Sequence, residues 1–282
     1  MRPSVTTLLL SGATALLVTT YFFRRRRRAC RRSAECDQSH PWLHPSSVPW
    51  AHKTIHQPVR RSAADTTRAD FVQVFDNMRR GIRDELVRQG AEHDAIDHID
   101  RMIQYNVPHG KGVRGMLVVQ AFRAMVPRAS GRRLYQAMAA GWVLEWSQAA
   151  ALVQDDMMDS APTRRGRPSW YRVEDVGYDA INDGLILENQ IFTLLRAHLE
   201  GEECYARLVS FVFDLLYITE QGQLLDLRTP FSSFTMERWR EVARTKTGIY
   251  TFYAPLHVAL ELAGIKDRAT YQTTLSFALT VG

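Results

Sequence analysis

The sequence predicts an all-α protein in which long helices surround a deep central cavity. Beyond position 65 the chain shows little of the alternation between polar and apolar residues that marks strands. Residues 134–159 and 205–227 are apolar nearly all round, which is typical of helices buried on every side. Both segments end in polar residues, so the interior of the bundle would be apolar and its mouth charged.

The long helices are expected in order along the chain. Residues 134–159 form the first and residues 205–227 the second. Residues 235–264 form a third, which contains Pro255. Proline has no N–H to donate inside a helix, so we expect a kink or a local break at this position.

Length and composition fit a globular domain. With 282 residues, 45% of them hydrophobic, the chain can bury one large core or two ordinary ones. The net charge is +6, but residues 1–32 contain eight arginines and no acid, which leaves 28 basic and 30 acidic residues in the rest. The basic charge therefore belongs to the amino-terminal segment, and the remainder is not predicted to bind nucleic acid.

The amino-terminal segment has the pattern of a membrane anchor or a targeting signal. Residues 5–23 contain no charged residue, and seven arginines follow within nine positions. The uncharged run approaches the ~20 residues that span a bilayer. We interpret residues 1–32 as a membrane anchor that leaves the rest of the chain facing the cytosol from an endomembrane or an outer organellar membrane. The alternative is a presequence cleaved in a mitochondrion or plastid, favoured by the absence of acids and the abundance of Arg, Ser and Thr.

Residues 33–64 are rich in Pro, Ser and His and are predicted to be a linker, so the folded domain would span residues 65–282. The cysteines Cys30, Cys36 and Cys204 have neither the spacing of a metal site nor that of a disulfide framework, which indicates a reducing environment. The nine histidines are scattered, and none is assigned a catalytic role.

The stretch DDMMDSAPTRRGRPSWY carries the clearest chemical signal. Asp155 and Asp159 are four apart and Asp156 and Asp159 three apart, so on a helix the carboxylates would reach toward one point. Three such anions need a cation among them, and carboxylate oxygens suit Mg²⁺ that also binds substrate phosphates. The sequence therefore predicts a magnesium–diphosphate site.

Basic residues before and after this cluster would complete the site. Arg164 and Arg165 follow it directly and offer forked donors that match phosphate oxygens. In HGKGVRG, Lys111 and Arg114 are three apart after glycines that permit close backbone approach, which suits a second diphosphate. The spacing differs from that of a P-loop.

Two further sets of residues share helix faces. Gln223 and Asp226 are three apart on the second long helix, where an acid among apolar residues needs a partner; a metal or a structural ion pair would serve. Lys246 and Tyr250 are four apart with Thr247 beside them, so this lysine would clamp a leaving diphosphate.

With these motifs the chain resembles the trans-prenyltransferases, and among them the farnesyl diphosphate synthases. DDxxD is the first aspartate-rich motif of that family, and TRRG followed by Trp170 and Tyr171 is more similar to the farnesyl than to the geranylgeranyl subgroup. The resemblance covers about residues 71–282 and extends, in order, to the stretches GKGVRG, LEWSQAAALV, TEQGQLLDL and KTGIYTFYAP. It implies an isoprenoid synthase-type helical bundle.

The resemblance also implies an activity, head-to-tail condensation of isopentenyl diphosphate with dimethylallyl or geranyl diphosphate to give farnesyl diphosphate. It implies Mg²⁺ as cofactor and a homodimer. Site roles follow by resemblance: isopentenyl diphosphate at Lys111, Arg114, Gln148 and Arg165; the allylic diphosphate at Arg164; magnesium at Asp155, Asp156 and Asp159, supported by Gln223 and Asp226; and stabilisation of the carbocation around Lys246, Thr247 and Tyr250.

Two departures from the family pattern lead to further expectations. The family carries a second aspartate-rich motif on the helix that begins here near Ala269, and the sequence stops at Gly282 before reaching one. We therefore expect a chain truncated at its carboxyl terminus and poorly active or inactive in this form. Ala150 and Ala151 stand where farnesyl synthases carry bulky aromatics, about one turn below the aspartates. Small side chains there predict a product longer than farnesyl, unless Trp142, Trp146 or another helix closes the cavity.

Two alternatives remain at this point. A terpene cyclase of the same fold would ionise a prenyl diphosphate without adding isopentenyl units, and it would have no need of the GKGVRG and TRRG motifs. A non-catalytic, membrane-tethered partner subunit would explain the missing second motif, but such a subunit has no physical need of the other site motifs.

Overall fold

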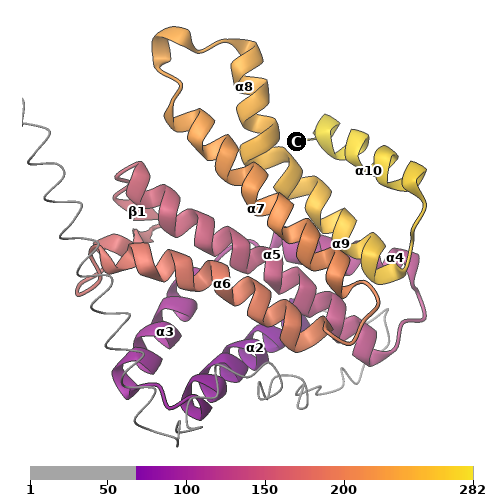
Figure 1. Cartoon of the computed structure of the whole chain (residues 1–282), viewed down its shortest axis with the longest axis horizontal. Helices are drawn as coiled ribbons and strands as arrows, with labels where there is room; N and C mark the ends of the chain where they lie inside the picture. Colours follow the sequence, from indigo (N-terminus) through magenta and orange to yellow (C-terminus); the bar gives the residue numbers. More distant parts are fainter. Residues whose placement is uncertain (1–67, 282) are drawn as a thin grey trace, which may run out of the picture. The chain divides into compact units, whose positions relative to one another are not determined.

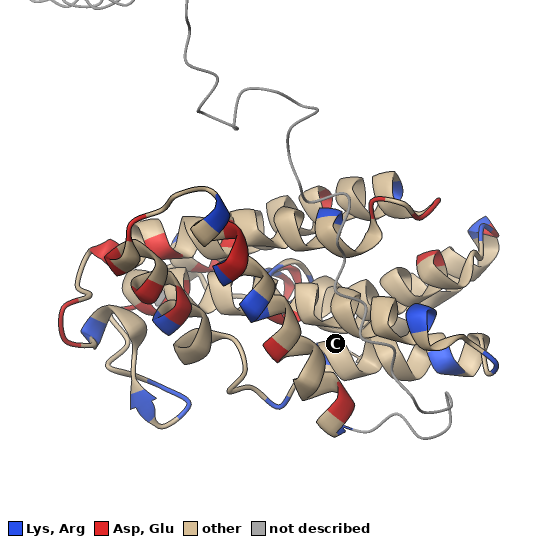
Figure 2. Cartoon of the chain, turned by 90° about the horizontal axis from the view of Figure 1, so that it is seen from below, with Lys and Arg blue, Asp and Glu red and all other residues tan. Residues whose placement is uncertain are grey.

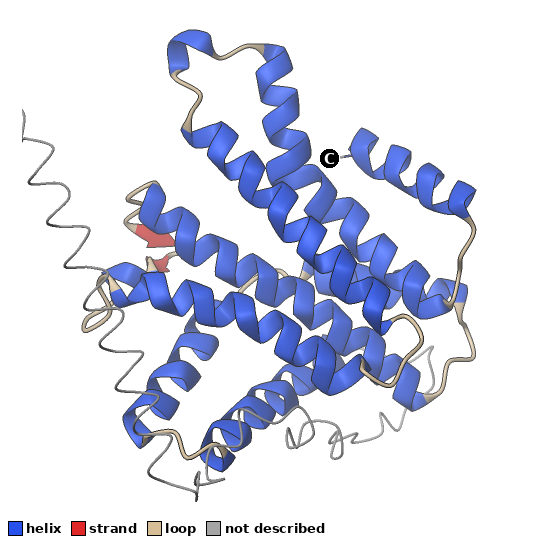
Figure 3. Cartoon of the chain, viewed as in Figure 1, coloured by secondary structure: helices blue, strands red, loops and turns tan. Residues whose placement is uncertain are grey.

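The computed structural model describes residues 68–281, which form a bundle of helices and confirm the all-α prediction (Figures 1 and 3). The chain runs through α2 (Arg68–Arg88), α3 (His93–Asn106), α4 (Val113–Met125), α5 (Gly131–Met158), β1 (Thr163–Arg164), β2 (Arg167–Pro168), η4 (Trp170–Arg172), α6 (Asp179–Leu199), α7 (Tyr205–Leu227), η5 (Phe231–Ser233), α8 (Met236–Val242), η6 (Ala243–Tyr253), α9 (Ala254–Ala263) and α10 (Arg268–Val281).

The helix α5 lies at the centre of the bundle. Ser130 caps its amino end by accepting a hydrogen bond from the backbone N–H of Arg133. Its residues are buried on all sides, and α4, α6, α2 and α9 pack around it. Figure 1 shows α5 and α6 side by side across the middle of the bundle, with α2 and α3 on one side and α7, α8 and α9 on the other. This burial explains the continuous apolar pattern that predicted residues 134–159.

The helices α4 and α5 approach each other at a pair of glycines. A Cβ added to Gly141 would lie 2.6 Å from the carbonyl oxygen of Gly115, so no side chain fits between the two backbones. The contact fixes α4, and with it the preceding glycine-rich loop, against the amino-terminal half of α5. The loop motif and the aspartate motif are therefore held on neighbouring elements.

The third predicted helix is irregular in the way that Pro255 suggested. Residues 236–263 run from α8 through η6 into α9, and the middle segment η6 is π-helical. Pro255 lies in the first turn of α9, directly after η6, where its missing N–H costs no helical hydrogen bond. Such π-helical segments occur often at functional sites.

A β-hairpin with strands of two residues each follows α5, and the sequence reasoning missed it. Thr163 pairs with Pro168 and Arg164 with Arg167 in an antiparallel ladder. Both turn residues, Arg165 and Gly166, have positive φ, of 55° and 77°. This is the geometry of the tight turns that join two antiparallel strands.

Charged residues are spread over several helices and loops of the bundle (Figure 2), and in α2 they include Asp76, Arg79, Arg80 and Arg83 in the middle of the helix. Among residues 68–281 no helix is long and apolar enough to cross a membrane. The predicted anchor at residues 1–32 and linker at residues 33–64 lie outside the described residues.

Candidate active site

A cavity of about 420 Å³ lies between the carboxyl-terminal half of α5, the end of α7 and the segment η6. Residues from four distant motifs line it, which brings together most of the predicted site. The predicted residues in its wall are Arg114, Gln148, Ala151, Asp155, Gln223, Lys246, Thr247 and Tyr250.

A second, much smaller cavity, of about 20 Å³, lies on the other face of α5. It contains three predicted residues, Asp156, Arg164 and Arg165, and shares Leu152 with the larger cavity. Lys111, Asp159, Asp226 and Ala150 line neither of these two cavities.

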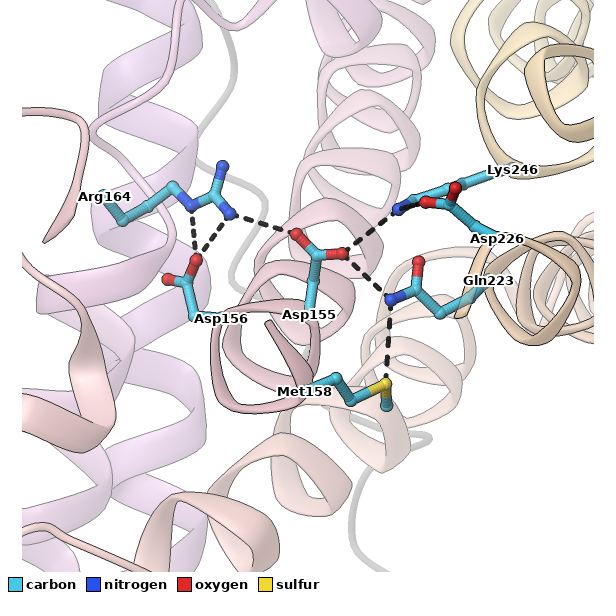
Figure 4. A network of polar contacts seen from close by, with 7 residues as sticks. All are labelled: Asp155, Asp156, Met158, Arg164, Gln223, Asp226 and Lys246. Carbon is cyan, nitrogen blue, oxygen red and sulfur yellow. Dashed lines mark hydrogen bonds and ion pairs between the residues drawn. The ribbon is translucent and has the colours of Figure 1, made fainter. Parts of the chain in front are cut away.

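Asp155 is the junction of the polar network (Figure 4). Its Oδ1 accepts a hydrogen bond from Nε2 of Gln223 at 3.0 Å and lies 3.3 Å from Nζ of Lys246. The same ammonium donates to Oδ2 of Asp226 at 2.6 Å. Carboxylates on the facing helices α5 and α7 therefore share one cation.

Partial burial acts to lower the pKa of Lys246, but the hydrogen bond to Asp226 and the negative charge of Asp155 outweigh it, and the pKa is raised. The lysine therefore stays charged at neutral pH. Its side chain remains partly open to the cavity, so the charge is available to an anionic ligand.

Asp156 faces the hairpin instead of the larger cavity. Its Oδ1 accepts hydrogen bonds from Nε and Nη2 of Arg164 at 2.8 and 2.5 Å, and the residue is 2% exposed. The hydrogen bond to Asp156, aided by the charges of Asp156 and Asp155, raises the pKa of Arg164 against the opposing effect of burial. A second contact of Arg164 reaches Oδ2 of Asp155 at 3.0 Å.

The three motif carboxylates do not converge as the sequence pattern suggested. Among residues 68–281 no group of three acidic, histidine or cysteine side chains is arranged as a ready metal site. Adjacent positions on a helix point about 100° apart, so Asp155 turns toward α7 while Asp156 turns toward Arg164. Asp159 is the exposed C-cap residue of α5.

Magnesium nevertheless fits one part of this arrangement. The oxygens of Asp155 and Asp226 already hold a single positive charge between two helices, in the form of the Lys246 ammonium. Oxygen donors of this kind suit Mg²⁺, which also retains waters and phosphate oxygens. The residues that fit a metal best are therefore Asp155 and Asp226.

The basic loop lies beside the hairpin. The Arg165 guanidinium donates to the backbone oxygen of Asn106 at 3.1 Å. A Cβ added to Gly110 would lie 3.1 Å from Arg165 Nη2, so the absence of a side chain lets the arginine approach. Gly112, with φ of 64°, turns the chain into α4, and Lys111 is exposed between the two glycines.

Arg114 extends from this loop into the larger cavity. Its Nη2 donates to Oγ1 of Thr251 at 2.6 Å, and its guanidinium lies 4.2 Å from the ring centre of Tyr250. The Tyr250 hydroxyl donates to Oε1 of Gln148, and burial raises the pKa of this phenol. Residues from α4, α5 and η6 therefore form one connected polar wall.

Sequence reasoning missed Glu145. This residue is 4% exposed, and its Oε1 accepts a hydrogen bond from the backbone N–H of Gly115 at 2.9 Å. It ties α5 to the end of the glycine-rich loop. An acid within a helix that is otherwise apolar nearly all round was the available signal, because such a carboxylate requires a partner.

The two alanines differ in position. Ala151 lines the larger cavity, whereas Ala150 is 2% exposed and lines neither cavity. The indole N–H of Trp142 donates to the backbone oxygen of Phe71, and that of Trp146 to Gln190 Oε1. Both tryptophans are buried in the core and neither lines the larger cavity.

Comparisons with known proteins identify relatives of the chain. The model of the polyprenyl synthetase family matches residues 96–282. The chain is 36% identical to the farnesyl diphosphate synthase of Dictyostelium discoideum over 228 residues, which cover 76% of this chain and 60% of the relative. It is 33% identical to the farnesyl pyrophosphate synthase of Gallus gallus over 240 residues, which cover 81% of this chain and 65% of the relative.

A solved structure is similar over the same part of the chain. It is farnesyl diphosphate synthase from T. brucei complexed with minodronate, with a TM-score of 0.71 and 26% identity, covering 76% of this chain and 67% of that one. The two curated relatives are longer, and this chain spans 60% and 65% of their lengths.

Proposed function

Because the chain belongs to the polyprenyl synthetase family, we propose that it condenses isopentenyl diphosphate with an allylic diphosphate, dimethylallyl or geranyl, to give farnesyl diphosphate or a longer prenyl diphosphate. The observation that carries the proposal is the pairing of two basic sites with one apolar cavity. Lys246 lies beside Asp155 and Asp226, while Arg165 lies against the loop of Lys111. Two diphosphates and one prenyl tail need this combination.

The allylic diphosphate would bind where Asp155, Asp226 and Lys246 meet. Magnesium, held by Asp155 and Asp226, would supply positive charge to the leaving diphosphate. Lys246 adds a fixed ammonium on the same side, which favours the charge that develops on the leaving oxygen. Thr247, next in the wall, would place its hydroxyl near the electron-poor allylic carbon.

Isopentenyl diphosphate would bind to Arg165, Lys111 and Arg114, with Gln148 closing the site through its contact with Tyr250. Its double bond attacks the allylic carbon, a carbon–carbon bond forms, diphosphate leaves, and a proton is lost from the new chain. A carbocation survives only where water is excluded. The apolar side chains of Ala151 and Leu152, which are only partly exposed, support such a dry pocket.

The test is incubation of the purified chain with Mg²⁺, isotopically labelled isopentenyl diphosphate and geranyl diphosphate, followed by mass spectrometry of the products. A linear diphosphate one isopentenyl unit longer supports the proposal. A cyclic hydrocarbon without label identifies a cyclase, and no turnover at all favours a partner subunit.

Matched variants connect the activity to the site. Asp155→Asn should abolish product formation, because it removes a charge at the centre of the network. Asp94→Asn, at an exposed position in the first turn of α3, should leave the rate unchanged. Equal loss in both variants would contradict the assignment of the site.

The proposed enzyme would be a homodimer. Large apolar side chains are exposed along one face of α6, at Tyr178, Ile181 and Leu185, with exposed fractions of 86%, 56% and 50%. Phe213 of the neighbouring α7 stacks on Phe192 of α6 and is itself 57% exposed, which extends this face. Self-complementary apolar faces are typical of two-fold dimers.

Sedimentation tests the dimer. The parent chain should sediment as a dimer and Leu185→Arg as a monomer; a monomeric parent chain would refute the proposal.

The proposed location rests on the sequence of residues 1–32. We propose a membrane anchor with the catalytic domain facing the cytosol, with organellar import as the competing outcome. Sequencing the amino terminus of the protein from its native source decides between them. An intact Met1 in the membrane fraction supports the anchor, and a cleaved terminus in a soluble organellar fraction supports import.

A further inference from the structure

A buried carboxylate outside both cavities joins three separate elements. Asp183 of α6 is 1% exposed. Its Oδ1 lies 2.8 Å from Nε2 of His98 on α3, and its Oδ2 accepts a hydrogen bond from the indole N–H of Trp170 at 2.8 Å. A carboxylate this deeply buried needs donors, and these two side chains supply them.

Trp170 connects this cluster to the hairpin. It begins η4, two residues after β2, and it is 1% exposed. The N–H of the preceding residue, Ser169, donates to the carbonyl of Pro162 at 3.1 Å and closes the base of the hairpin. A fixed indole therefore fixes the point from which both strands extend.

The other side of the hairpin is held by the end of α3. The Tyr105 hydroxyl donates to the carbonyl of Pro168 at 2.8 Å, and Arg167 donates to the carbonyl of Tyr105 at 2.5 Å. The ring of Tyr105 also packs on that of Trp170, with centroids 5.1 Å apart. The glycine-rich loop with Lys111 continues directly from this end of α3.

Two of the three arginines in the hairpin contact different partners. Arg164, on β1, reaches Asp155 and Asp156, whereas Arg165, in the turn, reaches the backbone of Asn106. A displacement of the hairpin would move both guanidinium groups together. Catalytic geometry is sensitive to shifts of about 1 Å, so whatever fixes the hairpin controls both the position of Arg165 at its diphosphate and the contact of Arg164 with Asp155.

We propose that His98, Asp183 and Trp170 form a positioning set that acts through the hairpin, orienting Arg165 for diphosphate binding and holding Arg164 against Asp155 and Asp156. The inference deepens the proposed function and rests on it. None of the three side chains lines the larger cavity, and Trp170 alone lines the smaller one, beside Arg164 and Arg165. The set therefore acts through the hairpin and does not touch the reacting atoms. They couple α3, which leads into the basic loop, to α6, which packs on the aspartate helix.

The test compares substitutions at His98, whose side chain is 31% exposed and can be changed without opening the core. His98→Ala removes the donor, and His98→Gln restores an N–H at a similar reach. His93→Ala, at an exposed position in the first turn of the same helix, is the matched control. Trp170→Phe keeps an aromatic ring and removes the indole donor together with part of the buried ring volume.

The first readout is hydrogen–deuterium exchange of backbone amides. In His98→Ala and Trp170→Phe we expect faster exchange confined to residues 162–172, with His98→Gln and His93→Ala close to the parent chain. Unchanged exchange in the hairpin would overturn the proposal. Equal acceleration throughout α5, α6 and α7 would also overturn it, because it would indicate a merely structural role.

The second readout is the affinity for inorganic diphosphate and, in the active chain, KM against kcat. We expect roughly tenfold weaker diphosphate binding and a matching rise in KM in His98→Ala, with kcat changed little and recovery in His98→Gln. A fall in kcat alone would contradict positioning. If the parent chain makes no prenyl product, the proposed function fails, while the exchange pattern still decides whether the cluster positions the hairpin.

Discussion

Two ion-pair clusters meet at Asp155, and they differ in exposure. On the hairpin side Asp156 is closed off, with its side chain 3% exposed, and Arg164 is committed to it through two hydrogen bonds. On the α7 side Lys246 and Asp226 remain open, with side chains 26% and 40% exposed. The comparison indicates that aspartates in one motif divide between holding the protein together and holding a ligand, and that burial decides which.

The largest effect on stability is expected at the closed cluster. Arg164→Ala leaves a buried carboxylate without its partner and should lower the free energy of unfolding by about 3 kcal/mol. Urea denaturation of the parent and variant chains measures this. Adding Asp156→Asn to Arg164→Ala should recover part of the loss, because the unpaired charge is removed. A loss below about 0.5 kcal/mol in Arg164→Ala would show that Asp156 is not held as its burial implies.

A third buried cluster, formed by His257, Phe211 and Glu261, extends the comparison. Burial lowers the pKa of His257 to about 4, against the opposing charge of Glu261. The unfolded chain, with a histidine pKa near 6.5, then binds more protons between about pH 6.5 and 4, so stability falls as the pH falls through this window.

The loss attributable to His257 should reach about 3 kcal/mol at pH 4. His257→Phe keeps the stacking on Phe211 and removes the titration, so it should flatten this part of the profile of unfolding free energy against pH. Identical profiles for the two chains would rule out the histidine as the cause.

The open cluster depends on the close approach of α7 and η6. A Cβ added to Gly222 would lie 2.4 Å from the backbone nitrogen of Lys246, and backbone cannot move aside cheaply. Gly222→Ala should therefore cost about 2 kcal/mol and displace Lys246, with a large loss of activity. Gly201→Ala, where no atom lies within 4 Å of the added Cβ, should affect neither. Full activity in Gly222→Ala would contradict the claim that this contact sets the position of the lysine.

The two alanines test where the prenyl tail grows. Ala151→Phe should shorten the product, because a bulky ring would enter the cavity beneath Asp155. Ala150→Phe should instead overpack the core and destabilise the chain by about 1–3 kcal/mol without a specific effect on product length. Chromatography of the prenyl products and thermal unfolding separate the two outcomes. An unchanged product length in Ala151→Phe would refute the role of this position.

Long apolar segments predicted the long helices, whereas local hydrogen bonding was harder to predict. Residues 205–227 form α7 with the expected bounds, but the expected burial on every side was wrong, because Phe213, Tyr217 and Leu224 are exposed. The helix α5 begins three residues earlier than expected and ends one residue earlier. The hairpin was missed because two-residue strands are too short to show a period. The π-helical segment left only an indirect signal in Pro255, since hydrogen-bond spacing cannot be read from an apolar pattern.

For the site, too, the sequence predicted which residues gather but not all of their contacts. The motifs identified which residues gather around the cavity, and Asp155, Gln223 and Lys246 meet there. They did not predict that Asp156 would turn to Arg164, because spacing alone treats every carboxylate on a helix face alike. The contact between Asp183 and His98 could not be predicted from the sequence either, because the two residues lie 85 positions apart.

The most direct test of this account is the affinity of Lys246→Ala for inorganic diphosphate with Mg²⁺, measured by calorimetry beside its unfolding free energy. Lys266→Ala, at an exposed lysine that pairs with Glu203, is the matched control. The account predicts that Lys246→Ala binds diphosphate roughly 10–100-fold more weakly while its unfolding free energy changes by less than about 1 kcal/mol. Unchanged affinity, or a loss of stability as large as that of Arg164→Ala, would contradict the division between a ligand-binding and a structural cluster.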